Sequence, residues 1–268
     1  MSSSFASDDC RRRLLTLALI LFFGLSTRVA YASTSVDLQT QVNADLQTQY
    51  TNGSNYPSGG TILTNGNVSF TLAYGPNGTS GTGTLQTGPF NPSSAVNIPV
   101  STSTFDIKVN IADPGTVYTL INSAYGLLNQ TIGSVEFKAT GGLDYTVNLV
   151  EGQNIRDHNN DGWNNLIGSG SLGHMYINTF SFAGGQVRLD EQAFVLPTSF
   201  QSATLTDIIL NGTGNPDGEP FLAAATVTSS TETAVPEPPS LVMVSLVVGM
   251  VAGWRRRNGR NGDAAKSA

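Results

Sequence analysis

Short segments in which apolar and polar residues alternate recur along this chain, and they constrain its fold more than any other feature. The clearest pair, 134–139 and 143–150, lies on either side of Gly141-Gly142. Alternation with a period of two puts apolar side chains on one face of a strand, and a Gly-Gly pair favours a tight turn. The two segments are therefore predicted to form a β-hairpin.

Other stretches predict further strands, with no long amphipathic helix among them. The segment from Val117 to Tyr125 could be a strand or one short helix, because its periodicity does not decide, and Asp113-Pro114-Gly115 indicates a turn. The remaining predicted strands cover 68–74, 105–111, 175–182, 186–196, 203–210 and 221–228. Many short strands at regular spacing predict an all-β fold.

The predicted architecture is a single β-sandwich or jelly-roll-like domain over 33–228. The tract from Gln192 to Val227 has the order strand, Phe/Leu/Pro corner, strand, Gly-rich loop, strand. In this order it resembles the last strands of galactose-binding-like jelly rolls. Whether 33–112 forms a sub-sheet of its own or joins the sheet built by later strands stays open.

The N-terminus has the three parts of a secretory signal peptide. Arg11-Arg12-Arg13 precede an apolar run over 14–25, and Ala30 and Ala32 flank Tyr31 in a small-x-small cleavage site. Residues 1–32 are therefore expected to be removed by signal peptidase after Ala32. A short N-terminal membrane anchor is the alternative.

The C-terminus also has three parts. A Thr/Ser/Pro linker over 229–240 contains Pro236-Glu237-Pro238, an apolar run spans 241–254, and Arg255-Arg256-Arg257 open a basic tail over 255–268. As a helix the apolar run is about 21 Å long, short of the ~30 Å bilayer core. With an exported N-terminus the arginines would stay in the cytoplasm. A short transmembrane helix suits a transient anchor; an ordinary single-span anchor is the alternative.

This order of parts resembles the PEP-CTERM signal of bacterial proteins that an exosortase processes. The resemblance covers roughly 235–257. It implies an exosortase-type enzyme and the inner membrane as partners, processing near the motif, and a final location at the cell surface or in the extracellular matrix. It also implies a bacterium that makes an extracellular polysaccharide.

The composition between the two ends excludes several functions. Residues 33–234 hold four Lys or Arg and fifteen Asp or Glu, a formal charge of −11. Such an acidic domain has no phosphate-neutralising patch, so nucleic acid is not expected as a partner. Cys10 lies in the signal peptide. The exported domain therefore has neither disulfides nor thiolate chemistry, and a lipid anchor is not expected.

One polar loop is a candidate calcium site. Asp157, Asn159 and Asp161 are spaced by two and are followed by Gly162, with a Trp163 carbonyl and an Asn165 amide as further oxygen donors. Hard cations such as Ca²⁺ take six to eight oxygens, and the pattern resembles the first half of an EF-hand loop. It departs from one because Gly168 occupies the position of the bidentate Glu. An Asx-rich turn network without an ion is the alternative.

The same loop could bind sugar. Trp163 lies beside Asn164, and an exposed aromatic ring with neighbouring amides suits the apolar face and hydroxyls of a sugar. A tryptophan that plugs the end of the fold is the alternative.

Catalytic patterns are weak in this sequence. His158 and His174 without cysteine make a poor zinc set, and no G-x-S-x-G motif is present. Asp190 and Glu191 are adjacent, so on a strand they would point to opposite faces rather than form a glycosidase pair. Arg156 beside Asp157 and Arg188 near Asp190 are expected to form structural ion pairs rather than to act as catalytic groups.

Two function hypotheses follow. The first is an exported, envelope-sorted, non-enzymatic protein that binds or structures extracellular polysaccharide, with Ca²⁺ as a candidate ion. The second is a secreted glycan-active hydrolase on a jelly-roll scaffold. A surface protein without a ligand is a third possibility.

Overall fold

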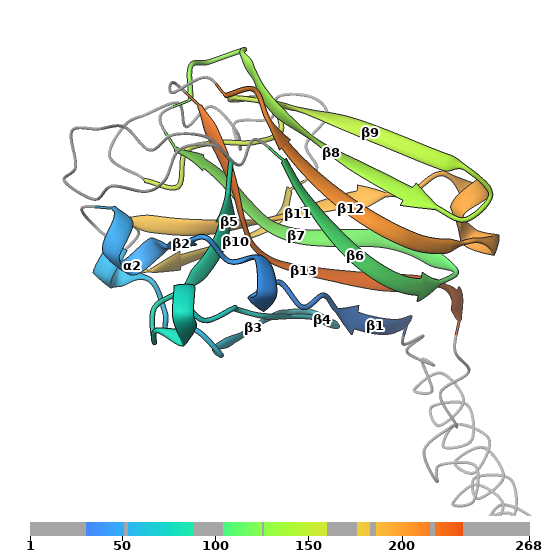
Figure 1. Cartoon of the computed structure of the whole chain (residues 1–268), viewed down its shortest axis with the longest axis horizontal. Coiled ribbons are helices and arrows are strands. Elements are labelled where there is room, and N and C mark those ends of the chain that lie inside the picture. The colour runs from blue at the N-terminus through green and yellow to red at the C-terminus, as the bar shows by residue number, and fades with distance from the viewer. Residues whose placement is uncertain are drawn as a thin grey trace, which may run out of the picture. The chain divides into compact units, whose positions relative to one another are not determined.

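The computed structural model describes residues 31–50, 53–87, 104–124, 126–159, 176–182, 186–214 and 218–232. This part of the chain is mostly β and is built from antiparallel sheets that include one curled, half-barrel sheet (Figure 1). The predicted all-β class is therefore confirmed at this level. The predicted apolar segments 14–25 and 241–254 lie outside the described residues. Among the residues that are described, no helix has the length and apolar character needed to cross a bilayer.

The elements follow one another as strands with short helical turns between them. The strands are β1 (Tyr31–Ser35), β2 (Ala44–Asp45), β3 (Ile62–Asn65), β4 (Val68–Thr71), β5 (Gly83–Gln86), β6 (Thr104–Ala112), β7 (Pro114–Ala124), β8 (Thr131–Ala139), β9 (Leu143–Val150), β10 (Tyr176–Phe182), β11 (Val187–Val195), β12 (Thr204–Gly212) and β13 (Glu219–Glu232). The helical turns are η1 (Gln39–Gln41), α2 (Leu46–Gln49), η2 (Gly53–Asn55), η3 (Pro76–Gly78) and η5 (Thr198–Ser202).

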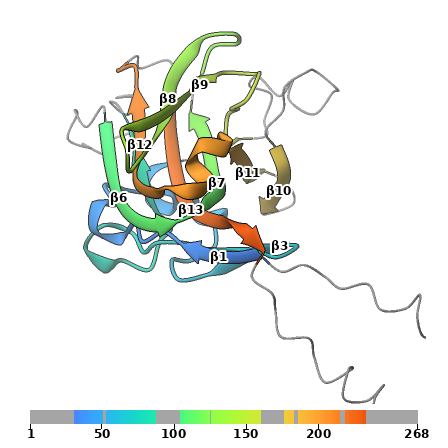
Figure 2. The same ribbon diagram turned by 90° about the vertical axis from the view of Figure 1, so that its right-hand side faces the viewer.

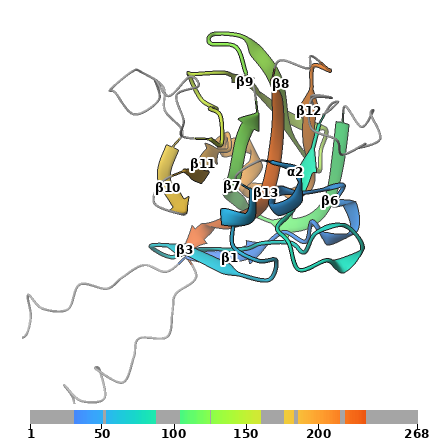
Figure 3. The ribbon, with the colours of Figure 1, turned by 90° about the vertical axis from the view of Figure 1, so that its left-hand side faces the viewer.

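Two larger sheets and one small one contain these strands. The seven-stranded sheet has the order β10-β11-β7-β13-β5-β2, with β1 also paired to β13. The four-stranded sheet has the order β6-β12-β8-β9, and β3 pairs with β4. Figures 2 and 3 show the long strand β13 running from beside β8 down to β1 and β3, with β12 to one side of it. Segment 33–112 is divided among the three sheets: β1, β2 and β5 belong to the seven-stranded sheet, β6 belongs to the four-stranded one, and β3 and β4 form the small sheet.

The predicted hairpin is confirmed as β8 and β9. Val135 faces Val147 and Phe137 faces Tyr145 in its register. Gly141 and Gly142 both have positive φ, at 81° and 74°, a conformation that glycine adopts without steric cost. The turn chemistry in the sequence therefore sets the register of the hairpin.

The ambiguous segment after Asp113 is strand β7. Asp113 has a φ of 49° and carries the chain from β6 in one sheet directly to β7 in the other. Its carbonyl accepts a 2.7 Å hydrogen bond from the Ser230 backbone N–H and a 3.1 Å bond from the Ser230 hydroxyl. The predicted turn at 113–115 is thus a sharp corner between sheets, held by the end of β13.

The main apolar core lies between the seven-stranded and four-stranded sheets. It joins Phe137 and Ile208 of the four-stranded sheet to Ile121 and Phe194 of the seven-stranded one, and all four side chains are essentially inaccessible to solvent. Burying side chains of this size stabilises the fold by about 1.5–3 kcal/mol each. This shared core is what holds the two sheets together.

A second apolar cluster covers the opposite side of the seven-stranded sheet. Leu46, Phe70 and Leu72 from the N-terminal part pack against Leu120 and Leu189 of the sheet. The seven-stranded sheet therefore has apolar partners on both faces.

The two ends of the described chain lie together. Tyr31 of β1 faces Glu232 of β13, at what we name the terminal end, whereas Glu219 at the start of β13 faces Ala124, at what we name the distal end. β13 extends to Glu232, so residues 229–232 of the predicted linker belong to this strand. Because β1 begins at Tyr31, cleavage after Ala32 would leave its last three residues in place.

Candidate functional site

The predicted calcium loop begins at the distal end. Asp157 and Asn159 are described there, whereas Asp161, Trp163, Asn164 and Asn165 lie outside the described residues. The Asp157 carboxylate accepts a 2.6 Å hydrogen bond from the Asn159 backbone N–H, which is the contact of an Asx turn. Within the described ranges, no three His, Cys, Asp or Glu side chains gather closely enough to hold a metal ion. The calcium site stays a prediction.

Backbone hydrogen bonds fix this first part of the loop between β7 and β11. The Ser123 N–H donates to the Arg156 carbonyl, and the His158 N–H donates to the Ser123 carbonyl, each at 3.0 Å. On the other side, Arg188 donates from its backbone N–H to the His158 carbonyl at 3.0 Å. Its side chain donates to the carbonyls of Asp157 at 3.0 Å and Asn159 at 2.8 Å. The first residues of the loop are thus held in place, and the carbonyls of Asp157 and Asn159 both accept hydrogen bonds from the Arg188 guanidinium group.

A buried ion pair lies beside this base. Arg156 holds Asp190 through two hydrogen bonds, Nε to Oδ2 at 2.7 Å and a terminal nitrogen to Oδ1 at 2.9 Å. Asn122 and Thr179 also donate to the Asp190 carboxylate, at 2.9 and 2.8 Å. The Asp190 side chain is inaccessible to solvent. Such a bidentate, fully hydrogen-bonded pair is a structural anchor for the loop.

The neighbouring carboxylate serves a different part of the molecule. Glu191 accepts a 2.9 Å hydrogen bond from Asn65, next to β4, and burial raises the pKa of Glu191. Asp190 and Glu191 therefore have separate partners and do not converge on one substrate position. As expected from their adjacency, they do not form the facing pair that glycoside hydrolysis requires.

His158 is part of the second core. Its Nδ1 lies 2.8 Å from the Tyr56 hydroxyl, and its ring centroid lies 4.1 Å from that of Tyr50. Burial, with a smaller effect of the Arg188 charge, lowers the pKa of His158 to about 3. The imidazole is therefore neutral at physiological pH and fills space among aromatic rings.

Two glutamates are buried at the same end. Burial raises the pKa of Glu151 to about 8, against smaller opposing effects of Ser123 and the Asp157 backbone. Burial likewise raises the pKa of Glu219 to about 8, although Gln86 donates a 2.7 Å hydrogen bond to it. Both carboxyl groups are protonated at neutral pH. A raised pKa is found in general acids, but exposed fractions of 0% and 1% leave these two without access to a substrate.

Sequence reasoning did not anticipate this polar network. Its members come from β5, β7, β10, β11, β13 and segment 151–159, and they meet only through the sheet topology. The one local signal was the run Asp190-Glu191-Gln192 inside an otherwise apolar strand pattern, since consecutive polar residues in a central strand require buried partners.

No family model matches the chain, and no curated protein matches it.

Proposed function

We propose that this chain is an exported, envelope-sorted protein that binds or structures an extracellular polysaccharide matrix and has no enzymatic activity. One observation carries the proposal, the three-part ending over 235–257 that resembles a PEP-CTERM signal. Signal peptidase would cleave after Ala32, and the apolar run 241–254 would hold the chain in the inner membrane. An exosortase-type enzyme would then process it near Pro236-Glu237-Pro238 and release it to the surface or the matrix.

The arrangement of the domain's own ends supports a tethered protein. Tyr31 and Glu232 are register partners, so both targeting segments attach at the terminal end. The distal end lies at the opposite end of the 14-residue strand β13. As the finer fold assignment, we propose a single β-sandwich of the jelly-roll type, supported by two sheets that share one apolar core.

The buried acids support a binding role over a hydrolase. Asp190 is held by Arg156, and Glu151 and Glu219 have no contact with solvent. We include Ca²⁺ at the loop 157–165 as part of the proposal. Calcium would raise the melting temperature of the full chain, and Asp157→Ala would remove that rise. An equal rise in the variant would contradict the calcium site.

The sorting signal is tested by localisation. An epitope inserted at Gly141, in an exposed hairpin turn, marks the full chain in an exosortase-bearing bacterium. We expect the wild type in the surface or matrix fraction, and a variant with Ala-Ala-Ala in place of Pro236-Glu237-Pro238 in the inner membrane. Equal distribution of the two would overturn the sorting proposal. Co-sedimentation of the wild type with isolated matrix polysaccharide tests the binding role.

A further inference from the structure

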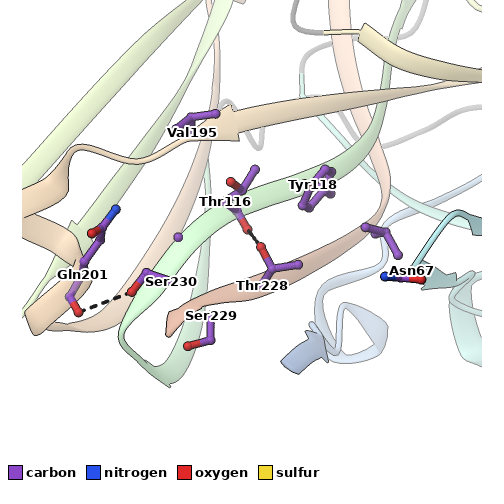
Figure 4. A pocket seen from close by; sticks show the side chains of 10 residues that line it. Asn67, Thr116, Tyr118, Val195, Gln201, Thr228, Ser229 and Ser230 are labelled. Atoms are coloured by element: carbon purple, nitrogen blue, oxygen red, sulfur yellow. Dashed lines mark hydrogen bonds between the residues drawn. The ribbon is translucent and has the colours of Figure 1, made fainter. Parts of the chain in front are cut away.

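A hollow of about 470 Å³ opens near the terminal end, far along β13 from the polar network described above. It lies between β7, β11 and β13, with η5 and the β3–β4 turn at its rim (Figure 4). Its volume falls within the roughly 300–1,000 Å³ typical of small-ligand sites. The hollow is lined by Asn67, Val68, Gly115, Thr116, Tyr118, Val195, Gln201, Thr228, Ser229 and Ser230.

The described lining is uncharged but rich in polar groups. Its ten residues have no charged side chain, and they combine two amides with four serine or threonine hydroxyls and a tyrosine ring. Val195 adds apolar surface, with 69% of its side chain exposed. A neutral ligand with many hydroxyl groups and an apolar face matches this lining, because amides pair with hydroxyls and an aromatic ring packs against C–H groups.

Two hydroxyl groups of the lining donate hydrogen bonds to backbone carbonyls of the chain. The Thr228 hydroxyl donates to the Thr116 carbonyl at 3.3 Å, and the Ser230 hydroxyl donates to the Asp113 carbonyl at 3.1 Å. Each hydroxyl has one proton and two lone pairs, so these two remain available as acceptors. Asn67 and Gln201 are exposed, and an amide both donates and accepts.

We propose that this hollow is a binding site for a short stretch of a neutral polysaccharide, with the Tyr118 ring as the packing surface and Asn67 and Gln201 as the groups that bind sugar hydroxyls. The inference rests on the proposed function and specifies its ligand. An anionic polymer is disfavoured, because the described lining residues include no lysine or arginine and residues 33–234 carry a formal charge of −11. The described residues of the predicted calcium loop, 157–159, are not part of this lining.

The experiment measures binding of oligosaccharides to the full chain in a detergent without a sugar headgroup. The panel contains neutral oligomers of glucose, mannose, galactose and N-acetylglucosamine, and one oligomer of uronic acid, with affinity measured by calorimetry. We expect a neutral oligomer to bind and Tyr118→Ala to weaken that binding about tenfold or more, whereas Tyr118→Phe, which keeps the ring, retains it.

Because Tyr118 is also packed against the second apolar cluster, Tyr118→Ala could unfold the chain. The exposed double variant Asn67→Ala/Gln201→Ala gives an independent test, with an unchanged melting temperature and several-fold weaker binding expected. Tyr74→Ala is the matched control, since Tyr74 is an exposed tyrosine, 47% accessible, outside this hollow. It should bind as the wild type does.

Four results would overturn the proposal. Binding that is lost in Trp163→Ala but unchanged in both hollow variants would place the sugar elsewhere and leave the proposed function intact. Binding of the uronic acid oligomer alone would contradict the neutral class. A change of oligomeric state in Asn67→Ala/Gln201→Ala, with sugar affinity unchanged, would make the hollow a protein contact. If no oligosaccharide and no matrix polysaccharide binds the wild type, the proposed binding function fails together with the site.

Discussion

The two larger sheets bury their residues in different ways. In β6 of the four-stranded sheet, Phe105 and Ile107 are buried whereas Asp106 and Lys108 are exposed. In β11 of the seven-stranded sheet, the six residues from Val187 to Gln192 are all buried. One sheet has a solvent face, and the other is covered on both sides along its central strands.

The cover on the second side is the N-terminal part of the chain. Phe70 and Leu72 pack against the seven-stranded sheet, and Asn65 binds Glu191 of β11. A sheet that is covered on both faces loses the alternation of apolar and polar residues. Polar residues in its strands are then buried and need partners of their own, which is why the ion pair and the protonated glutamates belong to this sheet and its neighbouring loop.

The largest effect should come from breaking the buried ion pair of the seven-stranded sheet. Asp190→Ala leaves the Arg156 guanidinium, 13% exposed, without its bidentate partner. We expect a loss of about 3–5 kcal/mol in the free energy of unfolding, measured by urea denaturation. Replacing both residues, as in Arg156→Met/Asp190→Leu, should cost less than the single change. A loss below about 1 kcal/mol in Asp190→Ala would show that the pair does not hold the loop.

Two matched Leu→Ala variants test whether the N-terminal cover contributes as much to stability as the core between the sheets. Leu72 belongs to the cover and Leu205 to β12, and both are essentially inaccessible. Each Leu→Ala change should cost about 2–5 kcal/mol, measured by the same denaturation. A much smaller cost for Leu72→Ala would mean that the cover opens independently of the sheets.

The same contrast explains how much of the fold could be predicted. The hairpin of β8 and β9 was predicted because Val135, Phe137 and Tyr145 alternate with polar residues around a Gly-Gly turn. Strand β7 stayed ambiguous because Leu120 and Ile121 face different apolar clusters, so no period of two remains. The Arg156–Asp190 pair could not be predicted, since only the pairing of β7, β10 and β11 brings its partners together.

Measuring stability as a function of pH tests whether the buried glutamates are protonated in the folded chain. Burial raises the pKa of Glu151 from 4.5 to about 8. Between these values the folded chain keeps a proton that the unfolded chain has lost, so the contribution of Glu151 to stability is greatest below pH 4.5 and falls as the pH rises, by at most about 1.4 kcal/mol per pH unit. Glutamine does not titrate. Glu151→Gln should therefore gain about 1–2 kcal/mol relative to the wild type between pH 6 and 8.

The control for this titration is Glu136→Gln, on the four-stranded sheet beside Lys138. Its difference from the wild type is the baseline against which the change in Glu151→Gln is compared. His158 acts in the opposite direction, because its lowered pKa of about 3 removes stability only as the pH falls below about 6.5. Parallel pH profiles for Glu151→Gln and the wild type would show that Glu151 is ionised in the fold.

The smallest effect should come from an ion pair on the solvent face of the four-stranded sheet. Lys108 bonds Asp106 at 2.7 Å and also contacts Asp207, but 71% of its side chain is exposed. Hydrogen bonds from Lys108 and Thr206 lower the pKa of Asp207, so any contribution is present above the unfolded pKa and is lost as the pH falls through the folded one. Because water and salt screen such a pair, Lys108→Ala should leave the urea midpoint unchanged in high salt. A clear loss of stability in Lys108→Ala at high salt would mean that an exposed ion pair contributes as a buried one does. A loss confined to Asp190→Ala would show that breaking an ion pair is costly when the pair is buried.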